Sequence, residues 1–338
     1  MSSMDTRNEF HDAADRLFGD LATPDVLESA EAGVFPKPLW DAVSASGFTQ
    51  VLVPEARGGV GGSLADGSAV LLAAGAHAVP GPLLETMLGN GLLAAAGLAS
   101  CEQPMSLAFT EAAASDRELV VRGVPWTEET AKRLVVARRG AKACLGVLGA
   151  GAGRNESDAT DTTGEPCGRI VLSSTMDWHP LEEGDFDAWL RRAALLRGAQ
   201  MLGAMRWCLE RTTAYTLERR QFGREIAKFQ AVQQMMAEMA SAFVASQAML
   251  DAAIAAADRP ALVAAARSRL GDAADIVCGH AHQVHGAIGF SYEYVLHFRT
   301  RRLMAWRDQF GTVAHWRRVL ARQFVGRSAD EVWPAIAD

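Results

Sequence analysis

The sequence predicts a mainly α-helical protein with a small β domain in the middle of the chain. Alanine-rich regions with helical periodicity lie towards both ends, and short runs of β-forming residues separated by glycines lie between them. With 338 residues, 49% hydrophobic and 22% charged, the chain has an ordinary globular composition. We expect an N-terminal helical domain over 1–103, an abbreviated β domain over 104–180 and a C-terminal helical bundle over 181–338.

The first hundred residues predict helices. Apolar residues recur near a period of 3.6 from Phe10 to Leu21. A glycine-rich stretch over 54–62 interrupts this pattern. The alanine-rich run over 65–78 then predicts a buried helix, which the proline at Pro80 ends.

The middle region has a different texture. Short runs rich in β-forming residues predict strands over 106–110, 119–121, 134–137 and 169–173. The stretch over 149–168 is rich in Gly, Asp and Thr, and this composition predicts a mobile loop.

The last third of the chain predicts long helices. The first runs from about Asp185 towards Arg219, the second begins near Phe229, and the third spans roughly 261–285. Methionines recur at helical spacing on the second helix, which is typical of a core face or a subunit interface.

Composition excludes several classes of protein. The formal net charge is −7 and the pI is about 5.7, so the chain lacks the basic surface that nucleic-acid binding needs. No apolar run approaches the roughly 20 residues that span a bilayer. The N-terminal stretch has no pattern of a signal peptide, and the five cysteines have no metal-ligand spacing. We therefore expect a cytoplasmic protein without a membrane span or a metal site.

Two segments carry the clearest functional signal. Residues 218–230 read ERRQFGREIAKFQ and residues 283–290 read QVHGAIGF, and Gly311-Thr312 follows further along the chain. In this order and spacing they resemble the C-terminal domain of the acyl-CoA dehydrogenase family. Phe109-Thr110-Glu111 resembles an earlier family segment, with Ala112 where the family has proline. The resemblance is poor over 117–184, and it implies a β-barrel-like middle domain and a C-terminal four-helix bundle.

The resemblance also implies that the chain binds FAD. A planar guanidinium suits a pyrophosphate, and the family arginine that corresponds to Arg219 usually contacts the flavin of a neighbouring subunit. Glycines let backbone amides approach phosphate closely. Trp126 matches a tryptophan beside the flavin ring but fits the role of a β-core residue equally well. The residues that the resemblance assigns to FAD are Arg219, Phe222, Gly223, Gln230, Gln283, Gly286, Gly289, Thr312, Thr110 and Trp126, and Ser115 is assigned to the CoA chain.

The family's catalytic base is missing from its usual positions. Most members have a glutamate immediately before Gly-Thr, where this chain has Phe310. A minority carry the base on the long helix before the arginine motif, at the position of Ala193. Asp185 and Asp187 are the acids nearest to Ala193, and Asp308 is the acid nearest to Phe310. The catalytic residue is therefore unknown from the sequence.

Three functions are consistent with this pattern. In the first, the chain is the base-lacking subunit of a heterotetrameric acyl-CoA dehydrogenase and completes the FAD site of a homologous catalytic partner. In the second, it is a self-sufficient homotetramer that uses a displaced acid such as Asp308. In the third, it is a non-catalytic flavin-binding or scaffold protein. The first two imply an acyl-CoA substrate and an electron-transfer flavoprotein or similar acceptor, and the sequence does not identify the acyl chain.

Overall fold

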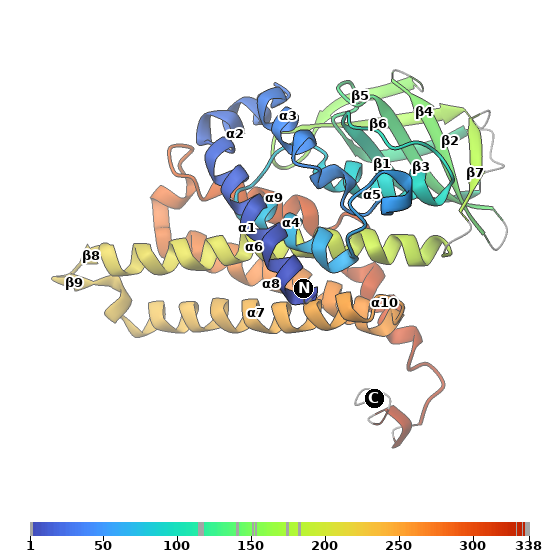
Figure 1. Cartoon of the computed structure of the whole chain (residues 1–338). Coiled ribbons are helices and arrows are strands. Elements are labelled where there is room, and N and C mark those ends of the chain that lie inside the picture. The colour runs from blue at the N-terminus through green and yellow to red at the C-terminus, as the bar shows by residue number, and fades with distance from the viewer. Residues whose placement is uncertain are drawn as a thin grey trace.

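The computed structural model describes residues 3–113, 118–139, 142–150, 152, 154–173, 176–181, 184–328, 330–332 and 334. Helices form both ends of the described chain and two small sheets form the middle (Figure 1). The predicted fold class is therefore confirmed. No helix in this described part is long and apolar enough to cross a membrane.

Five helices and two short 3₁₀ turns form the N-terminal region. The fourth helix is the predicted buried one, and it begins with a capping box in which Ser63 and Asp66 satisfy each other's backbone amides. Its sides are nearly all buried because it packs between its neighbours and the C-terminal bundle. The helices are α1 (Ser3–Leu21), α2 (Pro24–Glu31), α3 (Lys37–Ala45), α4 (Leu64–Ala76) and α5 (Leu83–Ala95), with 3₁₀ turns at Phe48–Gln50 and Glu55–Arg57.

The middle region forms two sheets with an apolar layer between them. One has the strand order β1-β3-β4-β7 and the other β2-β6-β5; only the β1–β3 pair is parallel among the described strands. Leu119, Val135 and Ile170 belong to the cluster that joins the two sheets. The strands are β1 (Met105–Ala113), β2 (Glu118–Pro125), β3 (Lys132–Arg139), β4 (Lys142–Gly149), β5 (Arg154–Thr160), β6 (Pro166–Ser173) and β7 (Asp177–Pro180).

The prediction of a mobile loop over 149–168 is wrong for most of that stretch. It contains β5 and the beginning of β6, which pair antiparallel. The sequence of β5, RNESDAT, has no alternation of apolar and polar residues, so side-chain patterning does not reveal it. Pairing with β6 along one edge satisfies its backbone groups instead, and this requires the neighbouring strand to be in place.

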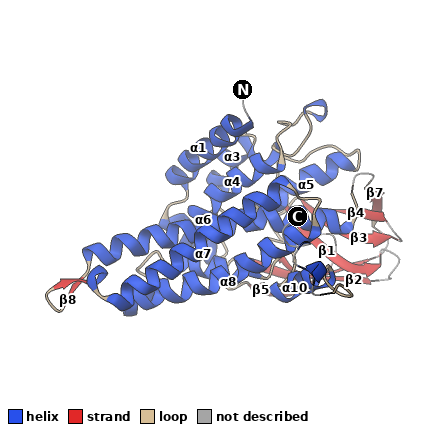
Figure 2. Ribbon diagram, turned by 90° about the horizontal axis from the view of Figure 1, so that it is seen from below, coloured by secondary structure: helices blue, strands red, loops and turns tan. Residues whose placement is uncertain are grey.

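The C-terminal region is built around α6 (Phe186–Glu218), which packs against α4, α7, α8 and α9. Asp185 caps its first turn by accepting a hydrogen bond from the amide of Ala188 at 2.7 Å. A hairpin leads from α6 to α7, and it projects from the end of the bundle opposite the sheets (Figures 1 and 2). The other elements are β8 (Arg220–Gln221), β9 (Arg224–Glu225), α7 (Gln230–Ala255), α8 (Pro260–His285), α9 (His297–Arg307) and α10 (Val313–Arg322), with 3₁₀ turns at Ile226–Lys228 and Gly286–Phe290.

Two glycines let α4 and α6 pack with their backbones in contact. A Cβ atom at Gly203 would lie 1.9 Å from the carbonyl oxygen of Leu72, and one at Gly75 would lie 1.9 Å from that of Gln200. The N-terminal helices and the bundle consequently share one apolar core. Among the methionines of α7, Met239 is fully buried in this core and Met235 is half-buried.

Candidate functional site

A cleft of about 720 Å³ separates the β domain from the C-terminal helices. Strand β1 contributes Phe109 and Glu111 to one wall, and α6 contributes Phe186. The connection between α9 and α10 contributes Asp308, Phe310 and Gly311. The remaining lining residues are Glu85, Leu107, Ala108, Arg122, Gly123, Pro125, Thr160, Asp161, Thr162, Cys167, Leu190, Met304, Ala305, Gln309 and His315.

An aromatic cluster fills the position expected for the base. The ring of Phe310 meets that of Phe109 edge-on at 5.8 Å, and Phe109 meets Phe186 at 5.7 Å. Phe310 has a φ of +53°, a left-handed conformation that is costly for a bulky residue. Packing therefore holds a side chain that cannot accept a proton at the wall of the cleft.

A buried ion pair lies behind Phe310. The guanidinium of Arg197 is 5.5 Å from the Phe310 ring and donates a 2.5 Å hydrogen bond to Glu85. It also donates to the side-chain oxygen of Gln200. Both charged side chains are 5% exposed. Burial lowers the pKa of Arg197, and the Glu85 carboxylate opposes that shift. Glu85 also lines the cleft, so one member of this buried ion pair reaches the cleft surface.

Sequence reasoning missed this pair. Glu85 is an acid in an otherwise apolar helix, LLETMLGNGLLAA, and Arg197 lies in an apolar part of α6. A charge on a face that must be buried is a signal that it has a partner, because an unpaired buried charge is expensive. The sequence does not indicate which partner, because the two residues are 112 positions apart.

The structure separates the acids considered as displaced bases. Asp308 lines the cleft, whereas Asp185 caps α6. Asp187 forms an ion pair of 2.6 Å with Arg138, and Ala193 is fully buried in the core. Asp161 is a further acid in the lining; burial raises its pKa, and a hydrogen bond from Thr163 counteracts the shift.

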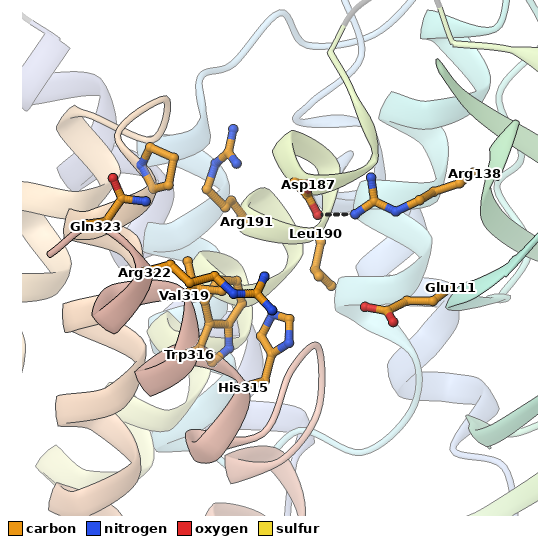
Figure 3. A pocket seen from close by; sticks show the side chains of 11 residues that line it. Glu111, Arg138, Asp187, Leu190, Arg191, His315, Trp316, Val319, Arg322 and Gln323 are labelled. Atoms are coloured by element: carbon orange, nitrogen blue, oxygen red, sulfur yellow. Dashed lines mark hydrogen bonds and ion pairs between the residues drawn. The ribbon is translucent and has the colours of Figure 1, made fainter. Parts of the chain in front are cut away.

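A second, smaller pocket of about 270 Å³ adjoins the cleft and shares Glu111, Leu190 and His315 with it. Figure 3 shows Arg322 and His315 on α10 facing this space, with Arg191 on α6 and the Arg138–Asp187 pair across it. Burial, followed by the nearby Arg318, lowers the pKa of His315. The basic side chains that line this smaller pocket suit an anionic group such as a phosphate. The other lining residues are Pro260, Trp316, Val319 and Gln323.

The arginine motif forms the projecting hairpin. Arg219 directly follows α6 as its C-cap and is exposed, and Gln230 is the first residue of α7 and is also exposed. Phe222 and Gly223 occupy the tip with φ values of +50° and +81°, as a two-residue turn with left-handed central positions requires. Phe222 is 90% exposed. The hairpin therefore presents a cation and an aromatic ring away from the body of the chain.

The glycine motif forms the turn after α8. Gly286 has φ +61° and ψ −140°, a conformation open only to glycine, and a Cβ atom there would meet nothing within 4 Å. Gln283 is exposed on the last helical turn. Gly289 is buried, and a Cβ atom there would lie 2.9 Å from the Cβ of His285. The backbone at Gly286 is thus open to a ligand, while Gly289 allows the turn to pack.

The remaining assigned residues lie elsewhere. Thr312 caps α10 by accepting from the amide of His315, and Thr110 is half-buried on β1 between two cleft residues. Trp126 is fully buried, and its indole N–H donates to Glu165 at 2.9 Å while its ring meets Phe35. Ser115 lies outside the described residues.

The assigned residues therefore form two groups towards opposite ends of α6. The cleft group lies near Arg197, and the hairpin group lies near Arg219. Between these two positions α6 rises about 33 Å, at 1.5 Å per residue. Figure 2 shows the same separation between β8 and the sheets. A single flavin dinucleotide does not bridge this distance, so one chain does not bring both groups to one flavin.

Comparisons with known proteins all point to one family. A family model described as the acyl-CoA dehydrogenase C-terminal domain matches residues 187–325, and one described as the acyl-CoA dehydrogenase N-terminal domain matches 4–103. Acyl-CoA dehydrogenase IpdE2 of Mycobacterium tuberculosis is 28% identical over 310 residues, covering 89% of this chain and 92% of the relative. Acyl-CoA dehydrogenase FadE34 of the same organism is 29% identical over 325 residues, covering 84% of this chain and 42% of the relative.

Solved structures share the fold at low sequence identity. The ChsE4–ChsE5 complex of Mycobacterium tuberculosis superposes with a TM-score of 0.87 at 20% identity, covering 97% of this chain and 100% of the other. A variant of the Tcur3481–Tcur3483 steroid ACAD superposes with a TM-score of 0.85 at 22% identity, with both chains fully covered. Butyryl-CoA dehydrogenase of Megasphaera elsdenii has a TM-score of 0.77 at 18% identity, covering 96% of this chain and 99% of the other.

Proposed function

Because the chain belongs to the acyl-CoA dehydrogenase family, we propose that it is the base-lacking subunit of a hetero-oligomeric enzyme. As a member of that family it is an FAD-dependent oxidoreductase of acyl-CoA thioesters, in which FAD supplies the hydride acceptor. The proposed role of this chain is to complete the FAD site of a homologous partner that carries the catalytic glutamate.

The main support for this proposal is the cleft of this chain itself. Phe310 stands where most family members have the base, and a phenyl ring cannot remove the α-proton of a thioester. The space next to that ring holds the buried Arg197–Glu85 pair. An apolar acyl chain does not displace two paired charges, because each would then be buried without its partner. The cleft thus lacks a carboxylate at the position where most family members carry the base, and a buried ion pair lies behind the phenylalanine that stands there.

The hairpin group supports the same role. Arg219 and Gln230 are exposed, and the backbone at Gly223 and Gly286 has open space around it. A guanidinium and accessible backbone amides suit a pyrophosphate, so these residues fit the adenylate half of FAD. Since they lie at the far end of α6 from this chain's cleft, the flavin that they would hold belongs to another chain.

The relatives suggest the partner and the substrate. ChsE4–ChsE5 is a complex of two chains, and Tcur3481–Tcur3483 is described as a steroid ACAD. We extend both features to this protein: its partner is a second acyl-CoA dehydrogenase chain in a heterotetramer, and the substrate is the CoA thioester of a bulky, steroid-derived acid. The enzyme is cytoplasmic and passes its electrons to an electron-transfer flavoprotein or a similar acceptor.

Co-expression tests the proposal. The chain should be colourless when produced alone, and it should purify with bound FAD and dehydrogenase activity when produced with a homologue that carries glutamate before its Gly-Thr. Absorbance near the flavin bands, normalised to protein, measures the occupancy. A yellow and active oligomer of this chain alone would overturn the proposal.

A self-sufficient enzyme is the second candidate, and the position of Asp308 in the cleft favours it. Under our proposal Asp308→Asn leaves the turnover of the complex unchanged, whereas replacing the partner's glutamate by glutamine abolishes it. The second candidate has no partner, so it requires that the oligomer of this chain alone be active and that Asp308→Asn abolish that activity. Steady-state assays of the complex and of this chain alone, each with and without Asp308→Asn, distinguish the two candidates.

A further inference from the structure

A network of polar and aromatic contacts joins the ends of α6 and α8, next to both flavin-binding motifs. It consists of Arg211 and Tyr215 on the last turns of α6, His285 at the end of α8 and Tyr294 beyond the glycine turn. The imidazole of His285 stacks on the ring of Tyr215 at 4.3 Å. The described contacts of these four residues therefore link three segments that are distant in sequence.

The hydrogen bonds of this contact network are all donated in the direction from Arg211 towards the carbonyl oxygen of Ala281. Nδ1 of His285 is 2.8 Å from the carbonyl oxygen of Ala281, so Nδ1 carries the proton. Nε2 of the neutral ring then accepts from the hydroxyl of Tyr294 at 3.0 Å. That hydroxyl in turn accepts from Nε of Arg211 at 3.2 Å. Burial lowers the pKa of His285, and Arg211 lowers it further, which favours the neutral tautomer that this arrangement needs.

Tyr215 and His285 each connect this contact network to one of the two motifs. The backbone amide of Arg219 donates to the carbonyl oxygen of Tyr215 at 2.9 Å, which closes the last turn of α6. His285 directly precedes Gly286, whose amide donates to the carbonyl oxygen of His282. A shift of Tyr215 against His285 would therefore move the arginine and the glycine turn relative to each other.

We propose that Tyr294 and His285 are positioning residues, which hold the arginine and glycine motifs at a fixed separation for the phosphates of FAD. The inference rests on the proposed function. An exposed hairpin and an open turn would otherwise have to be ordered when the ligand binds, and this ordering lowers affinity. The contact network orders the hairpin and the turn before the ligand binds, because His285 is buried and both of its ring nitrogens are hydrogen-bonded.

Tyr294→Phe tests the inference, since it removes the hydroxyl that bonds His285 and Arg211 and keeps the ring. In the complex of this chain with its partner, FAD should bind about 3- to 10-fold more weakly, because the two hydrogen bonds of the hydroxyl are lost and part of their free energy orders the two motifs. Riboflavin lacks the phosphates and the adenosine, so its affinity should not change. Tyr292→Phe is the matched control, because Tyr292 is 75% exposed and its described contact is a ring contact with His297.

Arg219→Ala separates this inference from the proposed function. If Arg219→Ala weakens FAD binding but Tyr294→Phe does not, the positioning role is wrong. Equal losses for FAD and riboflavin, together with a lower unfolding temperature of the flavin-free complex, would also overturn it, because they indicate general destabilisation. If Arg219→Ala leaves FAD binding unchanged, the assignment of the hairpin to the flavin fails, and the proposed function fails with it.

Discussion

At the scale of single residues, the most informative substitution is the phenylalanine at position 310. Its ring packs on Phe109 and on the guanidinium of Arg197, which is itself paired with Glu85. These residues belong to a loop, a strand and two helices, so the cleft wall depends on contacts between all three regions of the chain. The phenylalanine at the position expected for the base and the buried ion pair behind it are thus parts of one packed arrangement.

The Arg197–Glu85 pair makes a stability prediction. Arg197→Met should lower the free energy of unfolding by about 3–5 kcal/mol, because it leaves the Glu85 carboxylate buried without its partner. The double variant Arg197→Met/Glu85→Met should recover much of this loss, since no unpaired charge remains. Urea unfolding of the flavin-free complex measures both.

Arg138→Met is the control for that pair. It removes the ion pair with Asp187, whose side chains are 41% and 51% exposed, and exposed pairs contribute at most about 1 kcal/mol. A double variant that is less stable than Arg197→Met alone would contradict the argument that the unpaired charge causes the loss.

At the scale of elements, the packing of α4 on α6 connects the two helical regions. Their backbones touch where Gly75 and Gly203 face each other's helix, and neither position has room for a Cβ atom. Sequence patterning predicts both helices, because α4 is a long apolar run and α6 follows a capping aspartate. It does not predict the contact, since alanine and glycine fit a helical pattern similarly.

Gly203→Ala tests this contact. The new methyl group would overlap the carbonyl oxygen of Leu72, so we expect a loss of about 3 kcal/mol or more in the free energy of unfolding. Gly279→Ala is the matched control, because Gly279 is an exposed helical glycine of α8 with nothing within 4 Å of an added Cβ. It should be neutral or stabilise by about 0.5–1 kcal/mol. Similar unfolding midpoints for the two variants would contradict the close packing.

At the scale of the whole molecule, the residues assigned to the flavin divide between the cleft and the hairpin, at opposite ends of α6. Under our proposal, the hairpin group meets the flavin of another subunit. The exposed ring of Phe222 is the clearest mark of this arrangement, because a left-handed backbone and 90% exposure both disfavour phenylalanine in an isolated chain.

Phe222→Gly should therefore separate folding from assembly. Glycine relieves the strained backbone, so the unfolding temperature of the flavin-free complex should stay the same or rise slightly. FAD occupancy of the complex should fall, because the ring proposed to pack on the adenylate half is gone. Absorbance and thermal unfolding of the same preparation measure the two effects. A fall in both quantities would show that Phe222 stabilises the fold instead.

The fold class could be predicted from the sequence, because it depends on local patterns of periodicity and composition. The family could be predicted from the resemblance of residues 218–230 and 283–290 to family motifs, and that resemblance places Phe310 where most members have the base. Only the tertiary structure showed that β5 is a strand, that Glu85 and Arg197 pair across 112 positions, and that the motifs lie far from the cleft. These features arise from contacts between segments that are distant in the chain, and no local pattern encodes such a pairing.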